Sequence, residues 1–149
     1  MEEERHFFDV KSIWVGDSDG DGKLIAENRE MEYGRPACLN AKPGRTNPEE
    51  LLVESMVACY SITFAILAEK KRLPISHLEV SAQGEIVRQP DRSLKYTAIH
   101  IKPKITLESA DPAVQKSAID AAHRTDKYCL ISNALKGNVE ITVEPEITE

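Results

Sequence analysis

The sequence has few of the residues on which several common protein classes depend. Three of its 149 residues are cysteines, and no two of them form a CxxC pair. A zinc knuckle or thioredoxin-like motif is therefore unsupported, and three is a poor number for a secreted disulfide scaffold. Aromatic residues make up only 5% of the chain, which leaves little material for stacking nucleic-acid bases.

Positive charge and long apolar runs are also scarce. Lys and Arg number 19 against 25 Asp and Glu, and the net charge of −6 argues against binding a phosphate backbone. The longest apolar run, residues 56–68, is shorter than the roughly 20 residues of a membrane-spanning helix. The acidic start of the chain lacks the apolar segment of a signal peptide. We therefore expect one soluble domain over residues 1–149, in the cytoplasm, with neither nucleic acid nor membrane as a partner.

The hydrophobic pattern along the chain predicts an α+β fold. Strands are expected at 7–15, 23–27, 29–33, 78–86, 99–107 and 139–143, and helices at 48–72, from 112 onward and at 129–135. Pro103, within the fifth of these strands, indicates an edge or a bulge. Runs of strands separated by helices in this order are typical of the α+β class.

The helix at 48–72 is the strongest predicted element. Asn47 can cap it with Pro48 at the first helical position, or Thr46 can pair with Glu49 as a capping box. Its middle is apolar on nearly every side, which is typical of a helix surrounded by protein. Since a single domain of this size rarely encloses a helix completely, we infer that a second subunit covers part of its surface.

No metal site is expected. Asp17, Asp19 and Asp21 resemble the start of a calcium-binding loop, but the twelfth position is Asn28 instead of Glu. The flanking segments are predicted strands, so a hairpin turn is the better explanation. The histidines show no metal-ligand spacing such as HxxxH.

The three cysteines differ in their surroundings. Free cysteine is among the most buried residue types, so Cys59, within the apolar helix, can be simple core filler. Cys129 lies at the start of a short predicted helix, with Arg124 and Lys127 nearby. Unpaired backbone N–H groups and cations at such a position can lower the pKa of a thiol. Nothing near Cys38 singles it out.

The spacing of Glu49 and Cys59 sets a geometric constraint. The two residues are ten positions apart on one predicted helix, which is about 15 Å along its axis. If they cooperate, the Glu49 beside a given Cys59 must come from another subunit. Glu49 also has an ordinary role, because an acidic residue in the first turn stabilises the helix dipole.

Two blocks of the sequence resemble those of one known family. Residues 44–52 read GRTNPEELL and are followed by ACYS at 58–61. Residues 129–137 read CLISNALKG and are followed by VEI at 139–141. With WVG at 14–16, these blocks resemble the OsmC/Ohr family over essentially the whole chain.

The resemblance implies an OsmC-like fold, in which antiparallel sheets pack on two long central helices of an intertwined homodimer. It also implies a thiol-dependent peroxidase that reduces organic hydroperoxides. Cys59 would attack the peroxide, Cys129 would resolve the product as a disulfide, and Glu49 would help to hold an arginine. No bound cofactor is implied, and an external dithiol of the lipoyl type or a similar small reductant would restore the thiols.

The chain departs from the family pattern at two places. The Ohr branch has its arginine in the first hairpin turn, where this chain has none, and the OsmC branch has it where this chain has Leu39. The nearest candidates here are Arg35 and Arg45. Cys129 is followed by Leu130, where many relatives have proline.

Three functions remain open on the sequence. The first is the thiol peroxidase, for which apolar residues near Cys59 (Met56, Ile62 and Phe64) favour an organic hydroperoxide over hydrogen peroxide. The second is a non-enzymatic OsmC-like stress protein that binds a small apolar ligand. The third is a cysteine redox sensor in which Cys38 serves as a partner.

Overall fold

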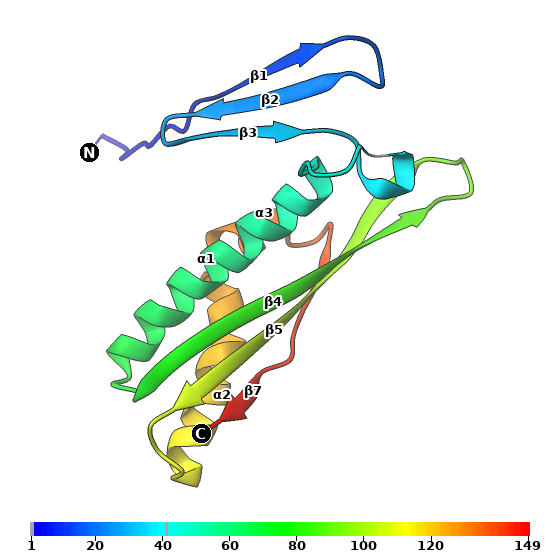
Figure 1. Ribbon diagram of the computed structural model, residues 1–149. Helices are drawn as coiled ribbons and strands as arrows, with labels where there is room; N and C mark the ends of the chain where they lie inside the picture. The colour runs from blue at the N-terminus through cyan, green and yellow to red at the C-terminus, as the bar shows by residue number, and fades with distance from the viewer. Residues whose placement is uncertain (1, 41) are drawn as a thin grey trace. The chain divides into compact units, whose positions relative to one another are not determined.

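A computed structural model describes residues 2–40 and 42–149 of the chain (Figure 1). It contains helices and sheets as expected, so the α+β class is confirmed. The chain divides into two compact units, one ending at Leu51 and the other comprising Leu52–Glu149. That the whole chain forms a single domain stays a prediction.

The first unit is built on a three-stranded antiparallel meander. Its strands are β1 (Val10–Val15), β2 (Asp21–Ala26) and β3 (Arg29–Tyr33), paired in that order. The turn between β1 and β2 is closed by Asp17, whose carbonyl and carboxylate oxygens accept from the N–H groups of Gly20 and Asp19, both at 3.0 Å. The hairpin predicted for the aspartate-rich segment is therefore confirmed, although β1 begins three residues later than expected.

The loop after β3 leads into the long helix. It contains a short 3₁₀ helix, η1 (Ala37–Leu39), and a single bridge between Tyr33 and Thr46. The side chain of Asn47 accepts from the N–H of Glu50 at 2.8 Å, which confirms Asn47 as the cap. The hydroxyl of Thr46 donates to the carboxylate of Glu50 at 2.9 Å, one residue beyond the Glu49 that the alternative capping box requires.

The second unit contains a mixed sheet. The helices and strands are α1 (Pro48–Lys70, which begins in the first unit), β4 (Ile75–Arg88), β5 (Leu94–Leu107), α2 (Pro112–Tyr128), α3 (Leu130–Leu135), β6 (Glu140–Val143) and β7 (Glu146–Thr148). β5 pairs with β4 in antiparallel fashion, and with β6 and β7 in parallel. The expectation of purely antiparallel sheets is thus wrong here, because α2 and α3 form a crossover long enough to return the chain in the same direction.

Three details of this unit differ from the prediction. The α1 helix ends at Lys70 and not at Arg72, because Arg72 adopts a left-handed backbone with φ of 53°. β7 was not expected. Pro103 lies in the central strand β5, neither at an edge nor at a bulge. On the side of β5 that pairs with β6 and β7, it falls between the two ladders, since pairing with β6 ends at Ile101 and pairing with β7 begins at Lys104. Its missing N–H therefore interrupts neither of those ladders.

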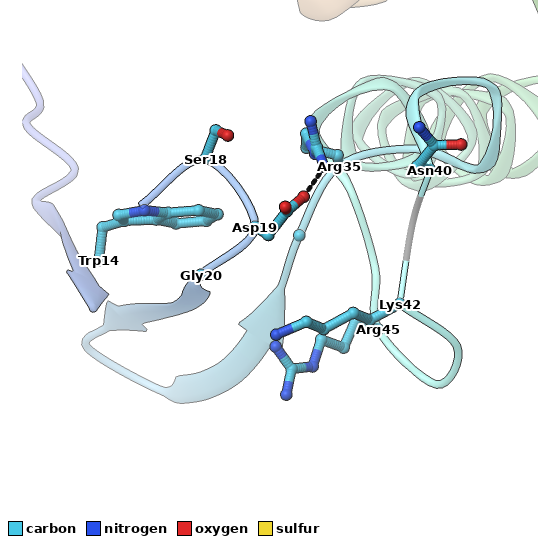
Figure 2. Close-up of a pocket in the computed structure, with 9 residues that line it drawn as sticks. Trp14, Ser18, Asp19, Gly20, Arg35, Asn40, Lys42 and Arg45 are labelled. Carbon is cyan, nitrogen blue, oxygen red and sulfur yellow. Dashed lines mark hydrogen bonds and ion pairs between the residues drawn. The ribbon is translucent and has the colours of Figure 1, made fainter. Parts of the chain in front are cut away.

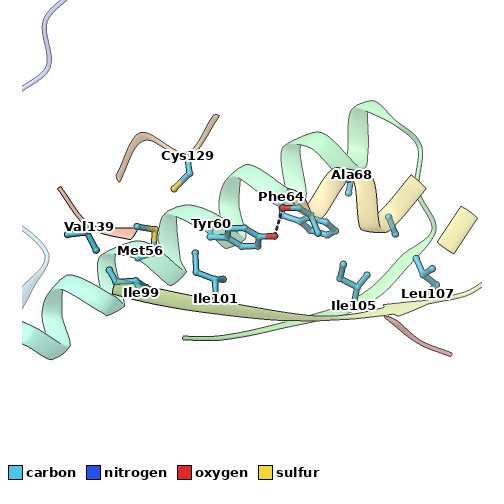
Figure 3. Packing of buried hydrophobic residues seen from close by; sticks show 13 residues of the cluster. Met56, Tyr60, Phe64, Ala68, Ile99, Ile101, Ile105, Leu107, Cys129 and Val139 are labelled. Carbon is cyan, nitrogen blue, oxygen red and sulfur yellow. Dashed lines mark hydrogen bonds between the residues drawn. The ribbon is translucent and has the colours of Figure 1, made fainter. Parts of the chain in front are cut away.

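One row of α1 residues forms the centre of the core. Residues four apart lie on the same side of a helix, and here they face alternate residues of β5 (Figure 3). The α1 row is Met56, Tyr60, Phe64 and Ala68, and its main partners on β5 are Ile99, Ile101, Ile105 and Leu107. α2 adds small residues, and the hydroxyl of Tyr60 donates to the carbonyl of Ala122 at 2.7 Å. Hence α1 and α2 are fixed to each other as well as to the sheet.

The opposite side of α1 is exposed in the single chain. Ile62 and Ile66 are 64% and 48% exposed. By length and composition alone α1 could also cross a membrane, although the core helix of a soluble protein has the same properties. Coverage of this surface by a second subunit, and the absence of a membrane partner, both stay predictions.

Candidate functional site

Two cysteines that are far apart in the sequence meet in the second unit. Cys59 lies on α1, one residue before Tyr60, so it is at the margin of the buried row and is half-buried. Cys129 is fully buried in the same core cluster (Figure 3). The two thiols are hydrogen-bonded to each other, and both are free. The structure thus brings together the pair that the sequence singled out.

Cys129 occupies the corner between α2 and α3. Its extended backbone, with φ of −70° and ψ of 118°, ends α2 and begins α3. Its N–H donates to Thr125 at 2.9 Å, and its carbonyl accepts from the N–H of Asn133 at 3.0 Å. The hydroxyl of Ser132 donates to Asp126 across the same corner. The position of the thiol is therefore fixed from both helices.

Opposing effects act on the thiol of Cys59. Burial is the largest effect and raises its pKa, because it disfavours the thiolate. Hydrogen bonds from the N–H of Ile131, the thiol of Cys129 and the N–H of Leu130 outweigh burial, and the pKa of Cys59 falls below its ordinary value. Within the described part of the chain, no cation is among the main groups that shift this pKa. Since the thiolate is the nucleophilic form, Cys59 is the more reactive of the pair.

Burial raises the pKa of the Cys129 thiol to about 11. The N–H of Ser132 counteracts burial in part, and the neighbouring Cys59 raises the pKa further. The expectation of a lowered pKa for Cys129 is wrong, because burial and the neighbouring Cys59 outweigh the N–H groups of Ser132 and Ile131 at the start of α3, which act to lower it. At neutral pH Cys129 keeps its proton and can donate it in a hydrogen bond to the Cys59 thiolate.

The backbone N–H groups of Leu130 and Ile131 are the part of the site that sequence reasoning missed. The short helix and its start were found in the sequence, but Cys59 was not expected as a second acceptor beside Cys129. No local pattern connects residues 130 and 131 to residue 59, since the contact depends on how α1 packs beside α3.

The candidate arginines are paired with aspartates in the first unit. Arg35 contacts Asp19 (Figure 2), whereas Arg45 and Lys42 both contact Asp21. Hydrogen bonds from Arg45 and then Lys42 lower the pKa of the exposed Asp21 carboxyl. The residues that imitated a calcium loop thus include two ion-pair partners of the loop cations.

Glu49 and Cys38 occupy the positions that the sequence indicates. Glu49 lies in the first turn of α1 and is half-buried. The helix is continuous from Pro48 to Lys70, so its spacing from Cys59 along the axis stays about 15 Å. Cys38 is exposed, within η1. Among residues 2–40 and 42–149, no cluster of His, Cys, Asp or Glu has the arrangement of a metal site.

Comparisons with known proteins extend over both sequence blocks. A family model described as OsmC-like protein matches residues 41–144. The uncharacterised protein YmaD of Bacillus subtilis (strain 168) is 27% identical over 146 residues, which is 95% of each chain. The organic hydroperoxide resistance protein OhrA of the same organism is 26% identical over 130 residues, covering 83% of this chain and 86% of OhrA. An OsmC-like protein of unknown function from Vibrio cholerae has a TM-score of 0.82 at 14% identity, covering 95% of this chain and 99% of that one.

The different surroundings of the two thiols predict different rates of alkylation. We expect iodoacetamide to modify Cys59 faster than Cys129 at neutral pH, because only Cys59 has a lowered pKa. Peptide-resolved mass spectrometry of the reduced protein across a pH series measures both rates. The urea-unfolded protein is the control, in which the two cysteines should react alike. Identical pH profiles for Cys59 in the folded and unfolded protein would contradict this assignment.

Proposed function

Because the chain belongs to the OsmC-like protein family, as the two sequence blocks indicated, we propose that it is a thiol-dependent peroxidase that reduces organic hydroperoxides. The observation that carries the proposal is the contact between Cys59, whose pKa is lowered, and Cys129, whose pKa is raised. Such a pair supplies one reactive thiolate and one protonated thiol in reserve. The similarity to OhrA, an organic hydroperoxide resistance protein, supports the substrate class.

In the first step, the Cys59 thiolate attacks the terminal oxygen of the hydroperoxide. An S–O bond forms as the O–O bond breaks, and the alkoxide leaves and takes up a proton from water to become an alcohol. Cys59 becomes a sulfenic acid, so sulfur is oxidised by two electrons while the peroxide is reduced by two. Cys59 is only half-buried, in contrast to the fully buried Cys129, so it is the thiol of the pair that is open to a substrate.

In the second step, Cys129 attacks the sulfenic acid of Cys59. A disulfide forms, and the hydroxyl group leaves with the proton of Cys129 as water. Loss of the Cys59 thiolate in the first step removes one of the effects that raise the pKa of Cys129. Cys129 thus becomes easier to deprotonate at the step in which it reacts. An external dithiol of the lipoyl type then reduces the disulfide by thiol–disulfide exchange, and no bound cofactor takes part.

An arginine and a carboxylate complete the proposed site. Arg35 or Arg45 would donate hydrogen bonds to the peroxide oxygens, and Glu49 would orient the guanidinium. Since Glu49 and Cys59 are separated along one helix, we propose that the carboxylate beside each Cys59 belongs to the other chain of a homodimer. The exposed Ile62 and Ile66 of α1 supply apolar surface for such a partner.

We propose the cytoplasm as the compartment, because free thiols stay reduced there.

Substitution of the cysteines should separate the two chemical steps. We expect Cys59→Ser to reduce dithiol-dependent consumption of cumene hydroperoxide to background, because the nucleophile is lost. Cys129→Ser should complete one turnover and accumulate a sulfenic acid at Cys59, which dimedone traps. Cys38→Ser is the matched control, in which the rate of hydroperoxide consumption should be unchanged.

Mapping the disulfide after mild peroxide treatment distinguishes the competing functions. A Cys59–Cys129 bridge supports the peroxidase. A bridge to Cys38 would favour the redox sensor, and absence of any bridge would favour the ligand-binding protein.

The arginine role predicts a selective loss of turnover. We expect Arg35→Ala or Arg45→Ala to lower kcat/KM for cumene hydroperoxide roughly 100-fold, because this is the usual effect of losing one hydrogen-bond donor to a developing oxyanion. Arg29→Ala, at an exposed site on β3, is the control and should have no effect. Full activity in both the Arg35 and the Arg45 variants would remove the arginine from the mechanism.

The surroundings of the thiols also predict a substrate preference. Met56 and Phe64 are buried in the core cluster against which Cys59 packs, whereas Ile62 and Leu130 are exposed. Apolar surface therefore remains beside the cysteine pair, and we expect kcat/KM to fall from cumene hydroperoxide to tert-butyl hydroperoxide to hydrogen peroxide. Equal or reversed rates in a peroxide-consumption assay would contradict this preference.

A further inference from the structure

A row of polar side chains crosses the solvent-facing side of the sheet in the second unit. Ile99 and Ile101 of β5 are buried in the core, so His100 between them faces the opposite side. Thr142 of β6 is the register partner of His100 and lies on the same side of the sheet. Glu85 of β4 approaches His100 from the other neighbouring strand. The row has no part in the cysteine site.

His100 connects the two outer members of the row. Its Nδ1 atom lies 2.7 Å from the hydroxyl oxygen of Thr142, which is a short hydrogen bond. Its Nε2 atom lies 3.9 Å from one carboxylate oxygen of Glu85. The other carboxylate oxygen of Glu85 accepts from the hydroxyl of Thr97 at 2.8 Å, which holds the carboxylate in place. The imidazole ring therefore faces a hydroxyl on one side and a carboxylate on the other.

These neighbours favour one tautomer of the neutral ring. An ionised carboxylate accepts hydrogen bonds and donates none, so Glu85 favours a proton on Nε2 of His100. Nδ1 then carries a lone pair, and the hydroxyl of Thr142 donates to it. A hydroxyl that donates to a basic nitrogen can pass its proton to that nitrogen as it attacks. The order of hydroxyl, imidazole and carboxylate is thus that of nucleophile, base and orienting group.

A second pair on the same face of the sheet lacks the histidine. Thr106 of β5 and Thr148 of β7 are register partners, and their hydroxyl oxygens are 2.9 Å apart. Either hydroxyl can donate to the other, but a hydroxyl is too weak a base to remove a proton at neutral pH. The contact of Thr142 with a ring nitrogen therefore offers chemistry that this pair does not.

We propose that Thr142, His100 and Glu85 form a second reactive site, at which Thr142 accepts the acyl group of a small activated ester. The hydroxyl oxygen of Thr142 bonds to the acyl carbon while its proton passes to Nδ1 of His100. The ester C–O bond breaks, and the alcohol leaves with that proton. Water, deprotonated by the same ring, then releases the acid, so the sum is ester hydrolysis and no electron is transferred.

The row is open to such a substrate. The side chains of His100 and Glu85 are 38% and 52% exposed, so a small ester can approach them from solvent. Since the reaction uses neither thiol, this activity is separate from the proposed peroxidase and does not depend on it.

Acetylation by p-nitrophenyl acetate tests the proposal. Residues 137–149 form one tryptic peptide, which contains no Lys or Cys and has Thr142 and Thr148 as its only hydroxyl residues. After a brief reaction and an acid quench, mass spectrometry should find the acetyl group on Thr142 and not on Thr148. We expect His100→Gln to slow this acetylation roughly 100-fold, because the general base is lost. His77→Gln, at an exposed site on β4, is the matched control and should leave the rate unchanged.

Absence of an acetyl group from residues 137–149 would overturn the proposal, as would equal acetylation of Thr142 in the His100→Gln variant. If that variant fails to fold, as judged by circular dichroism, NMR of the unmodified protein decides. The ring nitrogen shifts of His100 at mildly alkaline pH should then show the proton on Nε2, and a proton on Nδ1 would overturn the proposal. No peroxide is used in either measurement, so neither result bears on the proposed peroxidase.

Discussion

The packing of α1 against α2 is the constraint on which the site depends. The buried row of α1 faces β5, and the hydroxyl of Tyr60 reaches the carbonyl of Ala122 on α2. Because Cys59 immediately precedes Tyr60, this packing sets the direction in which its thiol points. A rotation of α1 by one residue, about 100°, would carry the sulfur away from Cys129. The chemistry of the pair is thus a consequence of the same contacts that hold the core together.

Burial and hydrogen bonding then give the two thiols different properties. Both are partly removed from water, which alone would raise the pKa of each. The corner between α2 and α3 directs two backbone donors and the thiol of Cys129 at Cys59, and these reverse the direction for Cys59 only. Cys129 is left fully buried and protonated. The difference in pKa between the two thiols therefore arises from burial and from neutral hydrogen-bond donors, without a charged side chain.

The candidate arginines of the first unit have partners of their own. Asp19, in the turn between β1 and β2, is paired with Arg35, and Asp21, the first residue of β2, is paired with Arg45 and Lys42. Exposed ion pairs of this kind contribute little to stability, so the exchange of one partner for another costs little free energy. The proposed role of an arginine at the peroxide requires such an exchange, and the exposure of these aspartates makes it accessible.

Much of the fold and part of the site could be read from the sequence. Strand alternation and helix caps are local properties, so all the elements except β7 were found, with Asn47 as one of two possible caps. The family and the pairing of Cys59 with Cys129 came from the resemblance of two sequence blocks. The ends of α1 and β1, the parallel pairing of β6 and the central position of Pro103 were not, because they depend on residues distant along the chain. The direction of the Cys129 pKa was wrong for the same reason. The sequence by itself determined which thiols are present and near which helices they lie. Only the tertiary structure decided that amides at the start of α3 also reach Cys59, since that depends on packing between α1 and α3.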